Sequence, residues 1–186
     1  YSENSLKISA DKSSSKNDID LVIICNGILH SEDFMPEKSI SQLSFENFNR
    51  TILINTILPA MIGKYFIPKL NKNSKSVFAV LSARVGSISD NRIGGWYSYR
   101  SSKAALNMII KNFSIEVKRR NKNAIIVGLH PGTVNSNLSK PFQGNVEKNK
   151  LFEPTFSAGK LVGVIQNLSG VDSGKCIAWD GKEIES

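Results

Sequence analysis

The chain has 186 residues, of which 40% are hydrophobic and 22% charged, and its formal net charge is +8 at pH 7. This composition is too apolar for a disordered chain, and the length favours one domain with a buried core. No unbroken apolar run approaches the roughly 20 residues of a membrane span, and no signal peptide opens the sequence. We therefore expect a cytoplasmic protein without a membrane partner.

The positive charge raises the question of nucleic-acid binding. Most basic residues are scattered, and the one cluster, at 118–122, stands where a long helical pattern ends. Cations at that position complement the helix dipole. No zinc-finger spacing, RNA-binding aromatic signature or basic heptad accompanies them. We expect no nucleic-acid partner and keep such binding as a minor alternative.

The two cysteines give no sign of a disulfide or a metal site. Cys25 and Cys176 lie far apart without a CxxC pattern, each inside an apolar run. This placement favours two buried free thiols. We expect no bound metal.

Apolar runs and helical patterns alternate along the chain. Residues 1–19 are polar and rich in serine, lysine and asparagine, and we expect them to be a leader beside a single domain over residues 20–186. The expected strands are unbroken apolar runs at 21–25, 76–81, 124–129 and 175–179, and the expected helices lie at 44–70, 98–118 and 155–168. This order predicts an α/β fold with a doubly wound parallel sheet and helices on both faces.

The segments that follow the first three strands are the candidate binding site, because ligands of such sheets bind at the carboxyl ends of the strands. These segments are residues 26–27, 82–89 and 130–133, and all are small, polar or turn-forming. The basic cluster at 118–122 precedes a strand and therefore lies at the opposite edge.

Tyr99 and Lys103 are four residues apart at the start of an expected helix. This spacing puts them on one helix face with Cβ atoms about 5–6 Å apart, whereas Tyr97 and Arg100 point elsewhere. An ammonium beside a phenol favours the phenolate, so we expect Lys103 to lower the pKa of Tyr99 toward the range useful for proton transfer. The pattern alone is weak and also occurs as a surface pair, but here it follows a glycine-rich loop after a buried strand.

Several segments in this order resemble the short-chain dehydrogenase/reductase family, and within it the C-factor-like and Sniffer-like carbonyl reductases. The segments are DLVIICNGILH (20–30), NTILPA (55–60), SARVGSISDN (82–91), YSYRSSKAALN (97–107), HPGTVNSNLS (130–139) and AWDG (178–181). The likeness runs from about residue 20 to the end. It implies a Rossmann-like domain and an oxidoreductase.

The resemblance implies that Tyr99 donates a proton to the carbonyl of a ketone or aldehyde while NAD or NADP supplies hydride. Lys103 would hold the phenol and bond the nicotinamide ribose, and Asn55 would anchor a water that feeds protons to Lys103. The residues support this last role, because Pro59 has no N–H to donate to the carbonyl of Asn55. The alternative is that Asn55 merely neighbours a helix kink.

The serine that binds the substrate carbonyl in the family has no direct counterpart. It stands three residues before the glycine that is Gly86 here, and that position is Ala83. Ser82 and Ser87 are the candidates to replace it, and we favour Ser87. Without such a donor, about 3 kcal/mol of transition-state stabilisation would be absent.

Two turns are expected to bind the cofactor by the same resemblance. The turn that would hold the nicotinamide carboxamide is made of Pro131, Gly132, Thr133, Val134 and Ser136, and the alternative is an ordinary turn at the end of a strand. Asn26 and Gly27 match the turn beside the adenosine ribose, although Ile24 stands where the family usually has asparagine. His130 has no role in the resemblance, and we interpret it as a packed or solvated neighbour.

The glycine-rich turn that binds the phosphates of a dinucleotide is missing from the sequence. No G-x-x-x-G-x-G occurs before Leu21, and the chain begins with Tyr1. We expect an amino-terminally truncated chain that holds the second half of the domain. Two functions stay open, a reductase within a longer chain and a non-catalytic remnant that acts as a binding or signalling module.

The resemblance also implies a homodimer through the helices that start near Ser44 and Ser98. The candidate interface residues are Ile54, Phe66, Met108 and Val117. The substrate is expected to enter over Trp96 and the segment 137–151, whose residues do not define its size or charge.

Overall fold

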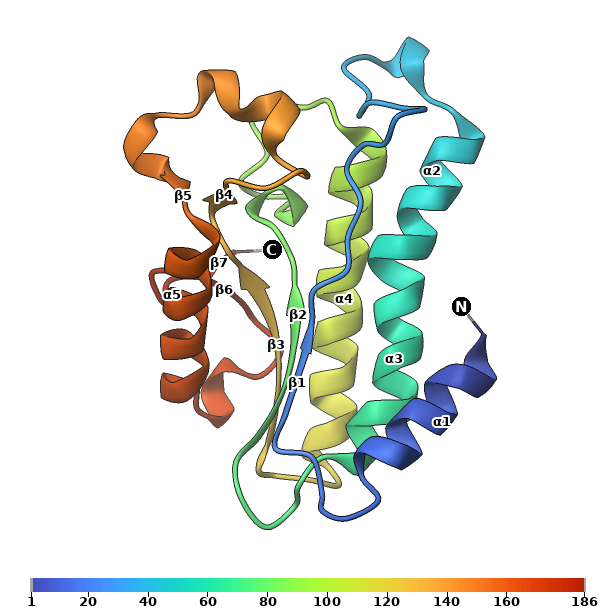
Figure 1. The fold of residues 1–186 in the computed structure, drawn as a ribbon, viewed down its shortest axis with the longest axis vertical. Coiled ribbons are helices and arrows are strands. Elements are labelled where there is room, and N and C mark those ends of the chain that lie inside the picture. The colour runs from blue at the N-terminus through green and yellow to red at the C-terminus, as the bar shows by residue number, and fades with distance from the viewer. Residues whose placement is uncertain (1, 186) are drawn as a thin grey trace.

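A five-stranded sheet in the order β1-β2-β3-β6-β7 forms the centre of the computed structural model, which describes residues 2–185 (Figure 1). The strands are β1 (Leu21–Ile24), β2 (Ser76–Leu81), β3 (Ala124–His130), β6 (Cys176–Ala178) and β7 (Glu183–Ile184). The first four are parallel, as predicted, and β7 pairs antiparallel with β6. The sequence analysis did not predict β7.

The strands β2 and β3 are buried on both faces, as their unbroken apolar runs predict. Phe78 and Val80 point into one core, while Val77 and Ala79 point into the other. β1 differs, because within the described residues it pairs with β2 alone. Leu21 and Ile23 are therefore 46% and 40% exposed.

The expectation of two buried thiols is wrong for one of them. Cys176 on β6 is buried, whereas Cys25 is exposed just after β1. The apolar run that contains Cys25 belongs to an edge strand, which explains the difference. Both cysteines are free.

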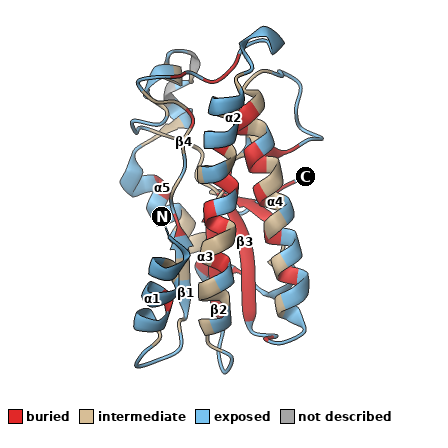
Figure 2. Ribbon diagram, turned by 90° about the vertical axis from the view of Figure 1, so that its right-hand side faces the viewer, coloured by how far each residue is buried: buried red, intermediate tan, exposed pale blue. Residues whose placement is uncertain are grey.

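Three helical segments and α4 (Tyr97–Lys118) cover one face of the sheet (Figures 1 and 2). The segments are α2 (Phe45–Ile52), the π-helical turn η2 (Leu53–Ile57) and α3 (Leu58–Phe66), followed by the 3-10 turn η3 (Ile67–Lys69). They form the one continuous helix that the sequence predicts. The π turn directly precedes the segment that contains Pro59, whose missing N–H interrupts the regular ladder.

By length and composition alone, the helix Phe45–Lys69 could cross a membrane. It has 25 residues, and its most apolar stretch has a mean hydropathy of 1.3 and is 33% buried. This is weak evidence, because a core helix of a soluble protein passes the same test. Here the helix packs against α4 and buries Asn55 and Thr56.

The helix α5 (Pro154–Asn167) covers the other face of the sheet (Figure 1). Its Ile165 packs with Val77 and Val127 in the second core. Between β3 and α5, the short strands β4 (Thr133–Val134) and β5 (Leu151–Phe152) pair in parallel. They close a loop that contains two 3-10 turns, η5 (Lys140–Asn145) and η6 (Lys148–Lys150).

A helix that we did not predict, α1 (Glu3–Ser13), lies in the polar leader. Ser2 caps it by accepting a hydrogen bond from the Ser5 N–H, and Ala10 is buried. Salt bridges join its Glu3 to Lys64 at 2.9 Å and its Asp11 to Lys69 at 2.8 Å. The leader is therefore packed against α3 by tertiary contacts that no local pattern shows.

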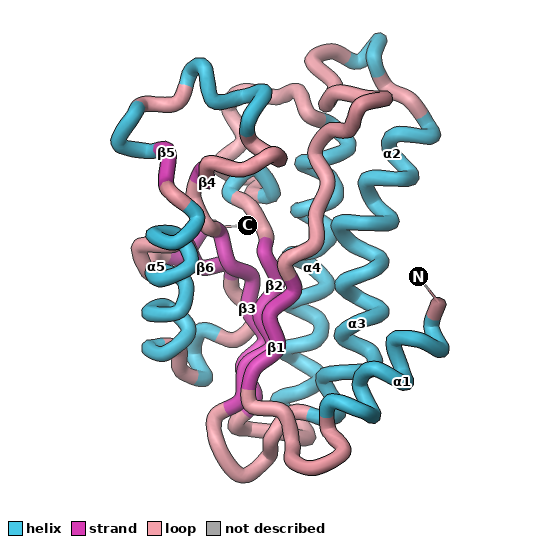
Figure 3. The backbone as a smooth tube through the Cα atoms, viewed as in Figure 1, coloured by secondary structure: helices cyan, strands magenta, loops and turns pink. Residues whose placement is uncertain are grey.

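Three further 3-10 turns complete the described elements, namely η1 (Ile40–Gln42), η4 (Arg84–Gly86) and η7 (Gly170–Asp172). The loops after β1, β2 and β3 lie at one end of the sheet (Figure 3). The basic cluster at 118–122 begins at the last residue of α4 and precedes β3, which puts it at the other end.

Candidate active site

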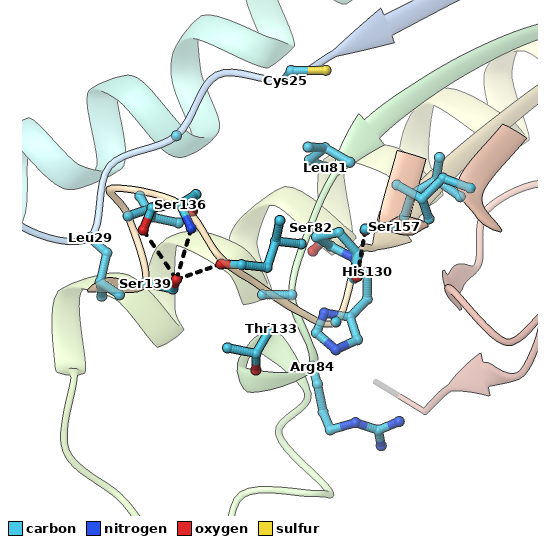
Figure 4. A pocket seen from close by; sticks show the side chains of 18 of the residues that line it. Cys25, Leu29, Leu81, Ser82, Arg84, His130, Thr133, Ser136, Ser139 and Ser157 are labelled. Atoms are coloured by element: carbon cyan, nitrogen blue, oxygen red, sulfur yellow. Dashed lines mark hydrogen bonds between the residues drawn. The ribbon is translucent and has the colours of Figure 1, made fainter. Parts of the chain in front are cut away.

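A cavity of about 640 Å³ lies at the carboxyl ends of β1, β2 and β3. The loops that follow these strands, the start of α4 and the inner side of α5 form its walls. Most of the predicted site residues line it, namely Asn26, Gly27, Ser82, Tyr99, Lys103, Pro131, Gly132, Thr133, Val134 and Ser136. Asn55 and Ser87 do not. Figure 4 shows part of the cavity from close by.

Tyr99 and Lys103 occupy the first two turns of α4 and are both buried, with exposed fractions of 7% and 3%. The Nζ atom of Lys103 lies 5.8 Å from the centroid of the Tyr99 ring. The same ammonium donates a hydrogen bond of 2.8 Å to the carbonyl of Leu81 at the end of β2. The structure therefore brings the predicted pair together at the end of the sheet.

Gly86 allows the loop after β2 to approach α4 at this point. A Cβ atom at Gly86 would lie 2.8 Å from both the carbonyl carbon and the Cβ atom of Lys103. This is closer than packed carbon atoms come, so a side chain would push η4 away from Lys103. The position requires glycine for close packing of the loop on the helix.

The expectation that Lys103 lowers the pKa of Tyr99 is wrong in this structure. Burial raises the pKa of Tyr99 to about 12 and lowers the pKa of Lys103 to about 8. Removal from water disfavours the charged form of each group, and it is the largest cause of both shifts. At neutral pH the phenol consequently keeps its proton, as a proton donor must.

Asn55 joins the loop after β1 to α4. It is fully buried in the π turn, and its side chain bonds both the N–H and the carbonyl of Ile28 at 2.8 Å. Its Nδ2 also donates to the hydroxyl of Ser102 at 3.0 Å. The side chain of Asn26 is held nearby, donating to the carbonyl of Ile54 at 2.6 Å. These bonds hold the loop after β1 against the π turn and α4, and the water at the carbonyl of Asn55 stays a prediction.

The two candidate serines differ from our expectation. Ser87 lies outside the cavity lining, where its hydroxyl accepts from the N–H of Asp90 at 3.1 Å and caps a turn. Ser82 lines the cavity, but its hydroxyl donates to Oδ1 of Asn107 at 2.7 Å. The structure thus gives no support to our preference for Ser87, because the turn after Gly86 directs its hydroxyl toward its own loop.

The turn of Pro131 and Gly132 is anchored from α5. The hydroxyl of Ser157 donates to the carbonyl of Pro131 at 2.8 Å. Ser139 bonds the carbonyls of Val134 and Ser136, so the following loop folds back on the turn (Figure 4). These contacts hold the predicted carboxamide-binding segment against the cavity.

His130 ends β3 at the wall of the cavity. Burial, with a smaller contribution from the charge of Arg84, lowers its pKa to about 4. Its Nδ1 atom is buried without a hydrogen-bond partner among the described residues. His130 is therefore neutral at physiological pH, in agreement with its interpretation as a packed neighbour.

Two aromatic residues of the cavity lining, Trp96 and Phe142, together with the neighbouring His30, extend the site beyond the predicted residues. The rings of Phe142 and Trp96 have centroids 4.9 Å apart, and His30 lies edge-on to Phe142 at 5.7 Å. The His30 ring also bonds the carbonyl of Asn137 at 3.0 Å through Nε2. The sequence analysis pointed to Trp96 and the segment 137–151. The single phenylalanine of a polar stretch is the signal that could have identified Phe142.

Known proteins are similar to this chain in sequence or in fold. The family profile described as short chain dehydrogenase matches residues 6–147. A 1-hydroxy-2-glutathionyl-2-methyl-3-butene dehydrogenase from Rhodococcus sp. (strain AD45) is 33% identical over 156 residues, which are 84% of this chain and 66% of that protein. The C-signal of Myxococcus xanthus is 28% identical over 146 residues, which are 78% of this chain and 82% of that protein.

Two solved structures superpose on nearly the whole chain. The carbonyl reductase Sniffer of D. melanogaster has a TM-score of 0.83 at 22% identity, covering 99% of this chain and 73% of its own. An NADPH-bound carbonyl reductase from chicken fatty liver has a TM-score of 0.83 at 25% identity, covering 99% of this chain and 70% of its own. The chain spans 66% of the length of the Rhodococcus relative. With the family profile matched over residues 6–147, the chain belongs to the short-chain dehydrogenase family.

Proposed function

We propose that the protein containing this sequence is an NAD(P)-dependent oxidoreductase that reduces a ketone or aldehyde to an alcohol. The observation that carries the proposal is the burial of Tyr99 and Lys103 side by side at the cavity, with Lys103 Nζ 5.8 Å from the Tyr99 ring. Buried titratable groups with shifted pKa values in a cleft are typical of catalytic sites. The carbonyl reductases among the structural neighbours support the reaction class.

Tyr99 is the proton donor of this proposal. Its pKa of about 12 keeps the phenol protonated at neutral pH, so its hydroxyl can donate to the oxygen of a carbonyl substrate. Lys103, still mostly charged below its pKa of about 8, offers an ammonium to ribose hydroxyls and to the developing charge. Ser82 is the predicted serine that borders the cavity, and binding a substrate would require its hydroxyl to leave Asn107.

The residues present fit the nicotinamide half of a dinucleotide. A Cβ atom at Gly27 would lie 3.8 Å from Nζ of Lys103, so glycine leaves the space before the ammonium open. Lys103 and the turn of Pro131 and Gly132 would hold the cofactor. The bound cofactor would supply the hydride. A phosphate-binding glycine-rich turn does not occur in residues 1–20, and we assign no residue of this sequence to the phosphates. Both NAD and NADP remain compatible with the site.

A non-catalytic binding or signalling role is the second candidate. The match to the C-signal of Myxococcus xanthus, over 82% of its length, favours it specifically. Nicotinamide binding separates the two, because a signalling module has no need of it. A cytoplasmic location is part of the first proposal.

A homodimer through α2, α3 and α4 also remains a proposal. Among the four residues that we named, Met108 is 60% exposed, whereas Phe66 and Val117 pack against the core of this chain. Leu53 on the π turn and Ile115 on α4 are 52% and 48% exposed. An interface on this side would therefore use Leu53, Met108 and Ile115 in place of Phe66 and Val117.

Replacement of Tyr99 by phenylalanine in the full-length protein tests the proposed reaction. Tyr99→Phe removes the proton donor but keeps the ring, so kcat should fall by about 10²-fold to 10⁴-fold with little change in cofactor affinity. Carbonyl reduction is measured by the loss of reduced nicotinamide absorbance with NADH and NADPH. Tyr97→Phe is the matched control, because Tyr97 lies on another side of the same helix. Loss of reduction in Tyr97→Phe with retention in Tyr99→Phe would refute the assignment.

A further inference from the structure

Glu37 is a buried carboxylate that the proposed reaction does not use. It lies between β1 and α2 and is 3% exposed. Its Oε2 accepts a hydrogen bond of 3.2 Å from the N–H of Ser98, and its main-chain carbonyl accepts one from the N–H of Trp96. Its Oε1 has no partner among residues 2–185. A buried carboxylate is costly, so its place at the start of α4 calls for a reason.

The turn that starts α4 has a backbone conformation that needs support. Gly94, Gly95 and Trp96 have φ angles of 67°, 64° and 49°, and Trp96 is the one non-glycine residue with positive φ in the described chain. Such a conformation is unfavourable for a bulky residue and persists only where the surroundings enforce it. Trp96 is also the N-cap residue, and its side chain makes no capping hydrogen bond. The first N–H groups of α4 must find acceptors elsewhere.

Glu37 and Arg100 hold this turn from two sides. Glu37 supplies the acceptors for the N–H groups of Trp96 and Ser98. Arg100 reaches back from α4, and its Nε donates to the carbonyls of Gly94 and Gly95 at 3.2 and 3.1 Å. A carboxylate at a helix N-terminus also complements the helix dipole, and its hydrogen bond to an N–H is charge-assisted.

The supported turn determines where the proton donor stands. The Trp96 ring meets the Tyr99 ring edge-on, with centroids 6.2 Å apart and planes at 77°. Tyr99 follows Ser98 directly, so a shift of the first turn of α4 would move the phenol. We propose that Glu37 is a positioning residue that caps α4 from a distant loop and thereby holds Trp96 and Tyr99 at the cavity. Its effect on turnover depends on the proposed function, whereas its capping role does not.

The test compares four forms of the full-length protein, namely wild type, Glu37→Ala, Glu37→Gln and Glu46→Ala. Glutamine keeps an oxygen acceptor, whereas alanine removes it. Glu46 is the matched control, because it is an exposed carboxylate in the first turn of α2 rather than of α4. NMR measures hydrogen exchange of the Ser98 amide and the indole N–H shift of Trp96, and kinetics measure kcat and KM for carbonyl reduction.

We expect exchange of the Ser98 amide to quicken at least about tenfold in Glu37→Ala, with a shifted Trp96 indole resonance. Misplacement of Tyr99 should lower kcat by roughly tenfold or more, with a smaller change in KM. Glu37→Gln should restore most of each signal, and Glu46→Ala should match wild type. If Glu37→Ala does not fold, the Glu37→Gln protein provides the test. Near-normal exchange of the Ser98 amide and a near-normal kcat in Glu37→Gln then support the capping role of Glu37.

Unchanged Ser98 exchange and an unchanged Trp96 resonance in Glu37→Ala would overturn the inference, whatever the activity. Equal loss of all signals in Glu37→Gln and Glu37→Ala would also overturn it, because the acceptor would not be what matters. If wild type reduces no carbonyl compound while Glu37→Ala still loses Ser98 protection, the cap stands and the proposed function fails. The two failures are thus distinguishable.

Discussion

The two halves of α4 bury different kinds of side chain although they belong to one helix on one face of the sheet. The first half, residues 97–107, buries Ser98, Tyr99, Ser102, Lys103 and, near its end, Leu106, whereas the second half, residues 108–118, buries Ile110 and Ser114. The first half lies at the carboxyl ends of the strands, beside the cavity. Its buried groups other than Leu106 are polar or titratable, as the proposed function requires of the half beside the ligand.

The polar groups of the first half are satisfied by other elements. The hydroxyl of Ser102 bonds Asn55 on the π turn, and Lys103 bonds the carbonyl of Leu81 on β2. Leu106 at the end of the first half and Ile110 in the second half pack in the apolar core with Phe78. The comparison indicates that apolar packing in the second half contributes most to stability. The first half buries polar groups at a cost in folding free energy, which is typical of functional sites.

The largest effect on stability is expected from a deletion in the second half. Ile110 is 2% exposed, so Ile110→Ala should lower the free energy of unfolding by about 2–5 kcal/mol through lost burial and a residual cavity. Carbonyl reduction per folded molecule should stay near the wild-type value. Ile115→Ala, at a position 48% exposed, is the control and should change stability by less than about 0.5 kcal/mol. Urea denaturation measures both variants.

The polar end of the sheet should also make the protein sensitive to acid through His130. Burial lowers the pKa of His130 from 6.5 to about 4, so the unfolded chain binds this proton at a higher pH than the folded protein. As the pH falls from about 6.5 to about 4, the free energy of unfolding should fall by about 3 kcal/mol from this group. His130→Asn lacks the titration, and its pH profile of stability should be flatter in that window. Parallel profiles for the two proteins would contradict the expectation.

Two buried serines, one in each half of α4, allow the smallest expected difference in stability between the halves to be measured. Ser102→Ala removes an acceptor from Asn55 and a donor to the carbonyl of Tyr99, which should cost about 1–2 kcal/mol. Ser114 donates to the carbonyl of Lys111 in its own helix, and Ser114→Ala should stay within about 0.5 kcal/mol. Thermal unfolding compares the two variants. Equal losses would show that the two halves do not differ in this way.

Most of the parallel sheet could be predicted because its central strands are apolar on both faces. The run 76–81 is the strand Ser76–Leu81, and the run 124–129 lies within Ala124–His130. The helix α1 could not be predicted in the same way. Its residues are polar, and its place depends on Ala10 and on ion pairs with α3 and η3 that are distant in the sequence.

The site was predictable where spacing along one helix determines geometry, and less so where loops decide it. Tyr99 and Lys103 meet because they are four residues apart on α4. The direction of the Ser87 hydroxyl depends on a turn, and the contact of Glu37 with Ser98 joins segments 61 residues apart. The pKa of Tyr99 depends on burial by the whole fold, which a sequence pattern of two residues cannot show.

Replacement of Lys103 by methionine tests most directly whether the first half of α4 holds polar groups for function. Burial lowers the pKa of Lys103 from 10.5 to about 8, which corresponds to a cost of about 3 kcal/mol for the charged form at neutral pH. Lys103→Met in the full-length protein should therefore raise the free energy of unfolding, by about 1–3 kcal/mol, while carbonyl reduction is lost. Lys111→Met, an exposed change in the second half, should leave both quantities nearly unchanged. A Lys103→Met protein that is less stable than wild type, or that reduces the carbonyl substrate at the wild-type rate, would contradict the prediction.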